Sequence, residues 1–217
     1  MTFNLIAARG HSGLVWAGFC FSILLLGGCG ALPDKPVRPA VFDFGPGPAT
    51  PPAAVPAPTL PPLLLADIEA PAAVDGTAVL FRLAYADVQQ LRPYAQARWS
   101  MPPAQLVRQR LREQLSQQRV VLSPVEGPAN LVLRLELEEF TQVFETPERS
   151  VGLVRLRATL LENVGGRERV VAQRRFTAQR PAPSPDAPGG VRALTAATDA
   201  AVDEIAHWLK QVPPAAR

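Results

Sequence analysis

The residue with the most definite chemistry in this 217-residue chain is Cys29. It closes the tetrapeptide LGGC at residues 26–29, which follows an apolar run and a positive charge at Arg9. Small residues before a cysteine let the backbone enter a peptidase site, and the thiol then accepts a diacylglyceryl group. We therefore predict that residues 1–28 are a lipoprotein signal peptide cleaved after Gly28, and that Cys29 carries a covalent lipid.

The apolar run before Cys29 is short for a membrane span. It covers Leu14–Leu26, whereas a spanning helix needs about 20 residues. The alternatives are an ordinary cleaved signal with an incidental cysteine, or an N-terminal membrane anchor. Cys20 leaves with the signal, so no disulfide can form within one mature molecule. Gly30 rather than Asp follows the lipidated cysteine, which by the usual sorting rule of Gram-negative bacteria favours the outer membrane over the inner one.

Side chains that could support catalysis or bind a metal are sparse. His207 is the only histidine after the signal peptide, and no second histidine or cysteine can complete a metal site. Gly-x-Ser-x-Gly, phosphate-loop and dinucleotide-binding motifs do not occur. Glu136, Glu138 and Glu139 share one predicted strand, and only a carboxylate pair assembled by the fold leaves a route to catalysis. We predict that the protein is not an enzyme and uses no cofactor, apart from the covalent lipid.

The composition changes abruptly after the lipidated cysteine. Eleven of the 24 prolines lie between Gly30 and Pro62, among Ala, Gly and Val. Such a stretch has little to bury and cannot donate a continuous hydrogen-bond ladder, so residues 29–62 are predicted to be an extended tether. At roughly 3.1 Å per residue its reach is on the order of 100 Å. The aromatic residues at 41–44 either add to a partner's sheet edge or form the first strand of the domain.

The folded domain is predicted at residues 63–212, with a tail at 213–217. Short apolar strands are expected at 63–70 and 78–84, followed by a less regular segment at 85–94.

A helix is predicted to begin at Ser100, as the N-cap, and to run to about Gln118. Pro102 and Pro103 are tolerated in its first turn. Its apolar stripe consists of Ala104, Leu106, Val107, Leu111 and Leu115. Its predicted water-facing residues are Arg108, Arg110, Arg112 and Glu113.

The second half of the domain alternates clearly. After a short strand at 119–122, alternating strands at 131–137, 150–162 and 169–180 predict an antiparallel meander. A loop at 181–190 leads to a final helix at 191–212. The apolar face of that helix carries Leu194, Ala197, Ala201, Ile205, Trp208 and Leu209.

This order of elements predicts an α+β fold, with an antiparallel sheet and two amphipathic helices packed on one face. The other face of the sheet is expected to carry Arg134, Glu136, Glu138, Arg155, Arg157, Arg174 and Arg175. This array is either a solvated face with cross-strand charge pairs or a surface that docks a partner.

The lipobox, the Pro-rich spacer and the run VLFRLAYADVQQLRPYAQARWSMPPAQLVRQRLREQL at residues 79–115 resemble the ABC-type transport auxiliary lipoproteins. This group includes the PqiC component of the paraquat-inducible Pqi system. The leucine strand with Phe140 and the closing AVDEIAHWL helix add to the resemblance, which covers roughly residues 63–210. Arg98 and Trp99 are either a docking feature or a core tryptophan with an arginine paired at its edge.

The resemblance implies a non-enzymatic subunit of a lipid-transport system that maintains membrane integrity. Its implied partners are an MCE-domain protein and an ABC permease with its ATPase, and the lipoprotein would dock the MCE assembly at the outer membrane, with homo-oligomerisation into a ring as an option. A net charge of +3 gives no indication of a nucleic-acid partner. The alternatives are an accessory lipoprotein of another outer-membrane assembly, such as a lipopolysaccharide-transport plug or secretin pilot, and, more remotely, a periplasmic hydrolase.

Overall fold

The structure is a computed structural model that describes residues 38–47 and 60–212, and Arg38–Arg217 form one compact unit. The predicted signal peptide, its cleavage after Gly28, the lipidated Cys29 and the tail at 213–217 lie outside the described residues. Among the residues described, no helix is both long and apolar enough to cross a membrane.

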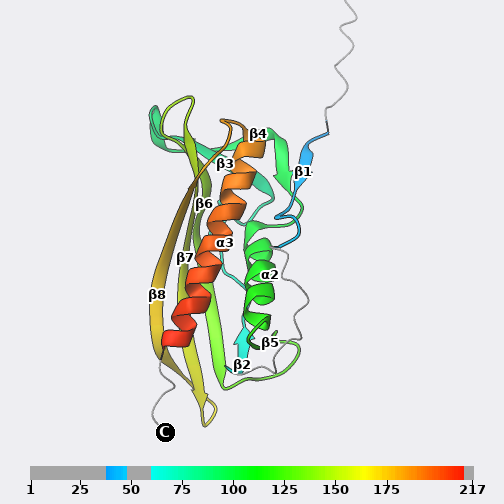
Figure 1. Ribbon diagram of the computed structural model, residues 1–217, viewed down its shortest axis with the longest axis vertical. Helices are drawn as coiled ribbons and strands as arrows, with labels where there is room; N and C mark the ends of the chain where they lie inside the picture. The colour runs from blue at the N-terminus through cyan, green and yellow to red at the C-terminus, as the bar shows by residue number, and fades with distance from the viewer. Residues whose placement is uncertain (1–37, 48–59, 213–217) are drawn as a thin grey trace, which may run out of the picture. The chain divides into compact units, whose positions relative to one another are not determined.

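The described chain forms eight strands and two helices (Figure 1). In chain order they are β1 (Ala40–Phe42), β2 (Leu60–Leu65), β3 (Ala78–Leu83), β4 (Asp87–Trp99), α2 (Pro103–Ser116), β5 (Arg119–Leu122), β6 (Leu131–Phe144), β7 (Ser150–Val164), β8 (Arg167–Pro181) and α3 (Ala187–Gln211).

One mixed sheet contains all eight strands. The long strands β6, β7 and β8 form the predicted antiparallel meander. Along its other edge, β6 pairs in parallel with β2 near its start and with β3 near its end. Because β2 and β3 both run parallel to β6, the sheet is mixed rather than purely antiparallel. Strand β5 extends β2, and β4 followed by β1 extends β3.

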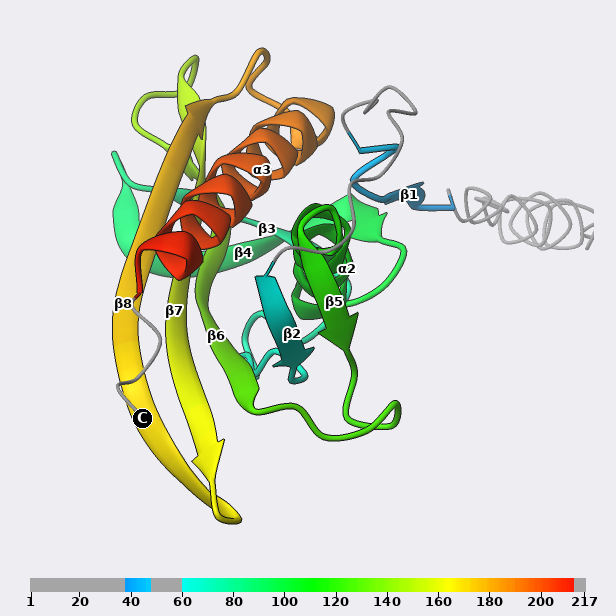
Figure 2. The same cartoon turned by 60° about the horizontal axis from the view of Figure 1, so that its bottom comes forward.

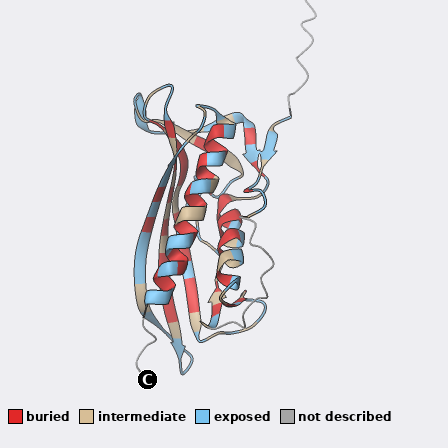
Figure 3. Ribbon diagram, viewed as in Figure 1, coloured by how far each residue is buried: buried red, intermediate tan, exposed pale blue. Residues whose placement is uncertain are grey.

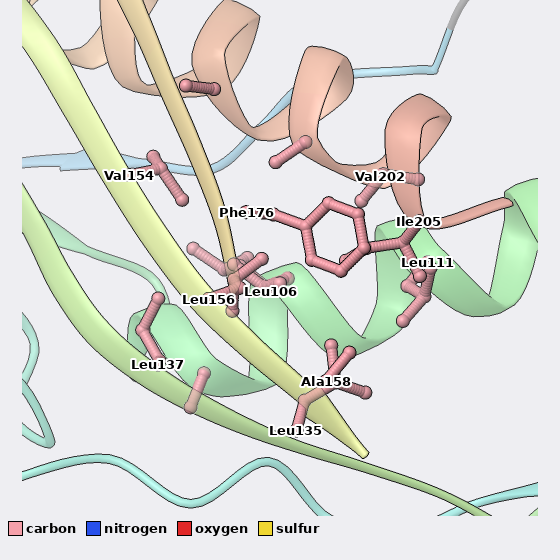
Figure 4. Packing of buried hydrophobic residues seen from close by; sticks show 14 of the residues in the cluster. Leu106, Leu111, Leu135, Leu137, Val154, Leu156, Ala158, Phe176, Val202 and Ile205 are labelled. Carbon is pink, nitrogen blue, oxygen red and sulfur yellow. The ribbon is translucent and has the colours of Figure 1, made fainter. Parts of the chain in front are cut away.

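The two helices cover one face of this sheet, as predicted (Figure 2). Over the first half of β6 and most of β7, alternation buries one side of the strand, and the helices bury their apolar stripes against the sheet (Figure 3). Leu106 and Leu111 of α2 and Ile205 of α3 face Leu156 and Phe176 of the sheet (Figure 4). These five side chains are at most 4% exposed, so the core lies between the helices and the meander.

Helix α2 does not begin at the predicted cap. Its N-cap is Pro102, without a side-chain cap bond, and Pro103 is its first residue. The backbone N–H of Ser100 instead donates to the Phe42 carbonyl over 2.7 Å, because Ser100 continues the pairing of β4 with β1. From Asp87 on, the predicted irregular segment at 85–94 is likewise part of β4, whose pairing with β3 is interrupted by register shifts that hide the alternation.

Helix α3 begins four residues earlier than predicted. The carboxylate of Asp186 accepts a hydrogen bond from the Gly189 N–H over 2.7 Å and caps the helix. A Cβ on Gly190 would lie 2.0 Å from the side-chain oxygen of Gln142, so a larger residue here would require that side chain to move. The Pro and Gly residues that suggest a loop are therefore the first turn of the helix.

Two predicted surface residues lie elsewhere. Arg110 of α2 is buried, at 6% exposure, because it falls on the apolar side of the helix, three residues after Val107. Arg174 pairs with Ala158 across the ladder and so lies on the helix-covered face, where its guanidinium stacks over the Phe176 ring at 5.1 Å. Both predictions of a solvent-facing or outer-face position are wrong.

Candidate anchoring and docking site

The first described residues, which we call the N-terminal strap (Arg38–Gly47), are part of the fold. Its strand β1 lies beside the end of β4 (Figure 1) and pairs with it in parallel. In this register Phe42 is opposite Trp99. Of the two predictions for the aromatic segment at 41–44, the structure confirms the second: the segment begins within the first strand of the domain. The folded unit therefore starts upstream of the predicted boundary at Leu63, inside the stretch assigned to the tether.

Phe44 attaches the strap to the aromatic part of the core. Its ring is 9% exposed and meets Trp99 edge-on at 5.7 Å between centroids. It also lies 6.1 Å from the Phe140 ring, which in turn meets Trp99 at 5.5 Å. Burying a phenylalanine side chain contributes about 1.5–3 kcal/mol, so this contact alone gives the strap a substantial attachment.

Arg110 holds the strap from the helix side. Its Nη2 donates to the carbonyl oxygens of Phe44 at 2.8 Å and Gly45 at 3.2 Å, and its guanidinium lies 5.9 Å from the Phe44 ring centroid. Gly45 adopts the left-handed region with φ +63°, and its N–H donates to the Asp43 carboxylate. This turn presents two successive carbonyl oxygens to one arginine. A charged donor such as a guanidinium binds carbonyl oxygens more strongly than a neutral donor does.

Asp199 of α3 completes the arrangement. Its Oδ1 lies 3.4 Å from Arg110 Nε, so the arginine connects the strap, α2 and α3. Burial raises the pKa of the Asp199 carboxyl, and the charge of Arg110 opposes that shift only in part, while Asp203 and Glu113 add to it.

Cavities lie on both sides of the strap. One of about 460 Å³ is bounded by the strap, Ser100 and the first half of α3, including Arg192 and Asp199. A smaller one of about 100 Å³ separates the strap from α2 near Leu106 and Glu113. Both are open to the surface and contain charges of both signs.

The outer face of the sheet carries a network of cross-strand ion pairs. Glu138 lies at a bulge of β6, where it accepts from Arg157 Nη2 at 2.5 Å and pairs with Arg175 Nε at 2.8 Å. Burial alone would raise the pKa of Glu138, but hydrogen bonds from Arg175 and Arg157 lower it overall. Arg134 pairs with Glu168 at 2.8 Å. The outer face therefore carries the cross-strand charge pairs that the sequence predicts.

A buried polar chain lies beneath the start of α3. The Tyr94 hydroxyl donates to Gln142 Oε1 over 2.9 Å, and Gln142 Nε2 donates to Ser150 Oγ over 2.8 Å. Burial, assisted by the negative charge of Asp186, raises the pKa of Tyr94 to about 12. These hydrogen bonds link side chains of β4, β6 and β7.

The remaining predicted residues are dispersed. Trp99 is 1% exposed and belongs to the core, whereas Arg98 beside it is exposed and forms no ion pair with any other described residue. His207 is exposed near the end of α3, 2.9 Å from the Gln211 amide. Within residues 38–47 and 60–212, no three His, Cys, Asp or Glu side chains gather as a metal site would require.

Sequence reasoning missed Arg110 and Asp199. The signal for Arg110 is its spacing, because it follows Leu106 by four residues and therefore belongs to the buried stripe of α2.

This α+β architecture is shared with other solved proteins. A Xanthomonas campestris protein of the DUF330 family matches with a TM-score of 0.60 and 22% identity, over 71% of this chain and 89% of its own. An uncharacterised protein matches with a TM-score of 0.56 and 13% identity, over 79% and 99% of the two chains. A hypothetical protein from Chlamydia trachomatis matches with a TM-score of 0.50 and 9% identity, over 70% and 96%. At these identities the likeness concerns the fold.

The family follows from the sequence. Residues 45–206 match the model of the ABC-type transport auxiliary lipoprotein component, and the chain belongs to this family. No curated protein matches the chain closely enough to count as a relative.

Proposed function

We propose that the protein is a non-enzymatic, membrane-anchored lipoprotein subunit of an ABC/MCE-type intermembrane lipid-transport system. The match of residues 45–206 to the transport auxiliary family is the observation that carries this proposal. In this role the protein docks the MCE assembly at the outer membrane. Its partners are the MCE-domain protein and the ABC permease and ATPase, and further copies of the chain are candidates for the same assembly.

Different parts of the chain have different roles in this proposed function. Signal cleavage after Gly28 exposes Cys29, whose acyl chains hold the protein on the periplasmic side of the membrane. Gly30 directs it to the outer rather than the inner membrane. The domain then offers a rigid body, since its core joins both helices to the meander and its outer face is fixed by charge pairs.

Crosslinking in intact cells tests the proposal. The full-length protein is crosslinked, purified from the membrane fraction and analysed by mass spectrometry. Recovery of an MCE-domain protein and its ABC permease is the expected result. Recovery of only an outer-membrane barrel or a secretin would keep the lipoprotein and overturn the transport role.

A Cys29→Ser variant provides the matched control. It keeps the whole folded domain but cannot be acylated, so it should remain as precursor or be found away from the outer membrane. The partners should then be lost from the crosslinked material although the domain is intact. An unchanged distribution on membrane fractionation would contradict the anchor assignment.

A further inference from the structure

The strap changes the length of chain available between the lipid and the domain. The sequence alone assigns residues 29–62 to a tether, yet residues 40–42 pair with β4 and Phe44 packs on the core. Three independent contacts hold them: the ladder with β4, the Phe44 ring beside Trp99, and the two carbonyls bound by Arg110. The chain is therefore fixed to the domain well before β2 begins at Leu60.

We infer that the strap fixes the exit point of the lipid anchor on the domain and keeps that end of the domain close to the bilayer. Arg38 follows Cys29 by nine positions in the chain. A fully extended chain spans at most about 3.3–3.6 Å per residue, so Arg38 lies within about 30 Å of the acylated residue. We call the chain between Cys29 and the first residue held by the domain the leash. If the strap were free, the leash would extend to Leu60, with a reach of about 100 Å. This inference rests on the proposed lipid anchor at Cys29.

The position of the strap indicates which end of the domain faces the membrane. Helix α3 begins and the β6–β7 turn lies at the same end of the domain as β1 (Figure 1). The β7–β8 turn and the last turn of α3 lie at the opposite end (Figure 1). A lipid surface is thus the partner of the β1 end, and the far end is the one that extends into the periplasm.

Two insertions of equal length separate a held strap from a free one. Twelve Gly/Ser residues are inserted either between Pro36 and Val37, within the leash, or between Ala53 and Ala54, behind the strap. A fluorophore is attached at Gln105→Cys on the exposed side of α2; once the signal peptide with Cys20 is removed, it is the only cysteine besides the acylated Cys29. Energy transfer to acceptors in the headgroups of phosphatidylethanolamine/phosphatidylglycerol vesicles then reports the distance from the bilayer.

A held strap makes the two insertions unequal. Because a flexible chain grows as the square root of its length, the leash insertion should increase the mean span of the leash about 1.5-fold, while the insertion behind the strap leaves it unchanged. A free strap would make both insertions equivalent, with an increase of only about 1.2-fold each. Equal responses on an acylated, vesicle-bound protein would overturn this inference and leave the proposed function standing.

The contact between Arg110 and the strap carbonyls is tested by adding Arg110→Met to the insertion between Ala53 and Ala54. This combination should restore part of the missing increase in distance, whereas Arg112→Met, on the same helix but paired with Glu126, should not. Circular dichroism and the unfolding midpoint show that each variant remains folded. A protein recovered from cells without acyl chains would overturn the anchor assignment, and with it both the proposed function and this inference.

Discussion

Asp199 between the helices and Glu138 on the outer face of the sheet both pair with arginine, but their surroundings shift their pKa values in opposite directions. Glu138 has two arginines within 2.8 Å, and they outweigh the effect of its burial. Asp199 has one arginine at 3.4 Å, and burial prevails. The difference follows from what each arginine binds, because Arg110 directs its shortest hydrogen bond to the strap carbonyl of Phe44.

This contrast shows two uses of the same residue types. On the sheet, charges keep an exposed face soluble and aligned, and such pairs contribute little to stability. Beside the strap, one arginine attaches a segment that composition alone would assign to a tether. Mutations at the strap should therefore cost more than mutations in the larger network on the sheet.

The largest effect is expected for Phe44→Ala. Removing a buried ring from the aromatic cluster with Trp99 should lower the free energy of unfolding by about 3 kcal/mol. Urea denaturation measures the change. Val41→Ala, whose side chain on the same strap is 62% exposed, should change it by less than about 0.5 kcal/mol. Equal effects of the two variants would mean that the strap does not pack on the core.

Arg110→Met should have the next largest effect. It leaves the carbonyls of Phe44 and Gly45 without their donor and Asp199 without its counter-charge, at a cost of about 2 kcal/mol. The cost is moderated because Asp199 is one-third exposed and can take up a proton. The same denaturation series includes Arg112→Met, which breaks only an exposed pair. A smaller decrease in the free energy of unfolding for Arg110→Met than for Arg112→Met would contradict the assignment of Arg110 as the residue that holds the strap.

Glu138→Gln should have a smaller effect, of less than about 1 kcal/mol, since Arg157 and Arg175 remain 36% and 58% exposed to water. Added salt should reduce the difference further, because exposed pairs are screened. Glu136→Gln, at the margin of the network, serves as the control. A loss as large as that of Arg110→Met would remove the distinction between the two regions.

The pH dependence of stability separates the two carboxylates by sign. Asp199 has a raised pKa in the folded state, so its contribution is most favourable at low pH and falls as pH rises above its ordinary value of 3.8. Glu138 has a lowered pKa, so its contribution is present above 4.5 and is lost as pH falls.

Denaturation of Asp199→Asn and Glu138→Gln between about pH 3 and pH 6 measures these small terms. The wild type should lose stability relative to Asp199→Asn as pH rises, and gain stability relative to Glu138→Gln. Slopes of the same sign would contradict the opposite environments.

The sequence predicts the regions in which local pattern and tertiary contact agree. The leucines of β6 and the apolar stripe of α3 alternate or repeat strictly, and both lie where their periodicity puts them. The strap could not be predicted in this way, because its prolines indicate an extended chain while the burial of Phe44 depends on Trp99 and Phe140, far along the sequence. The start of α3 was hidden for a similar reason, since Gly190 lies against the side chain of Gln142, which is far away in the sequence.

Hydrogen exchange of the full-length lipoprotein, followed by mass spectrometry, tests most directly whether the strap belongs to the fold. Amides of the peptide covering residues 38–47 should be protected to a degree similar to those of β4, with which β1 pairs. Arg110→Met should reduce that protection by roughly tenfold or more, with β6–β8 unchanged. Exchange of residues 38–47 at the rate of an unprotected chain would contradict the account and return them to the tether.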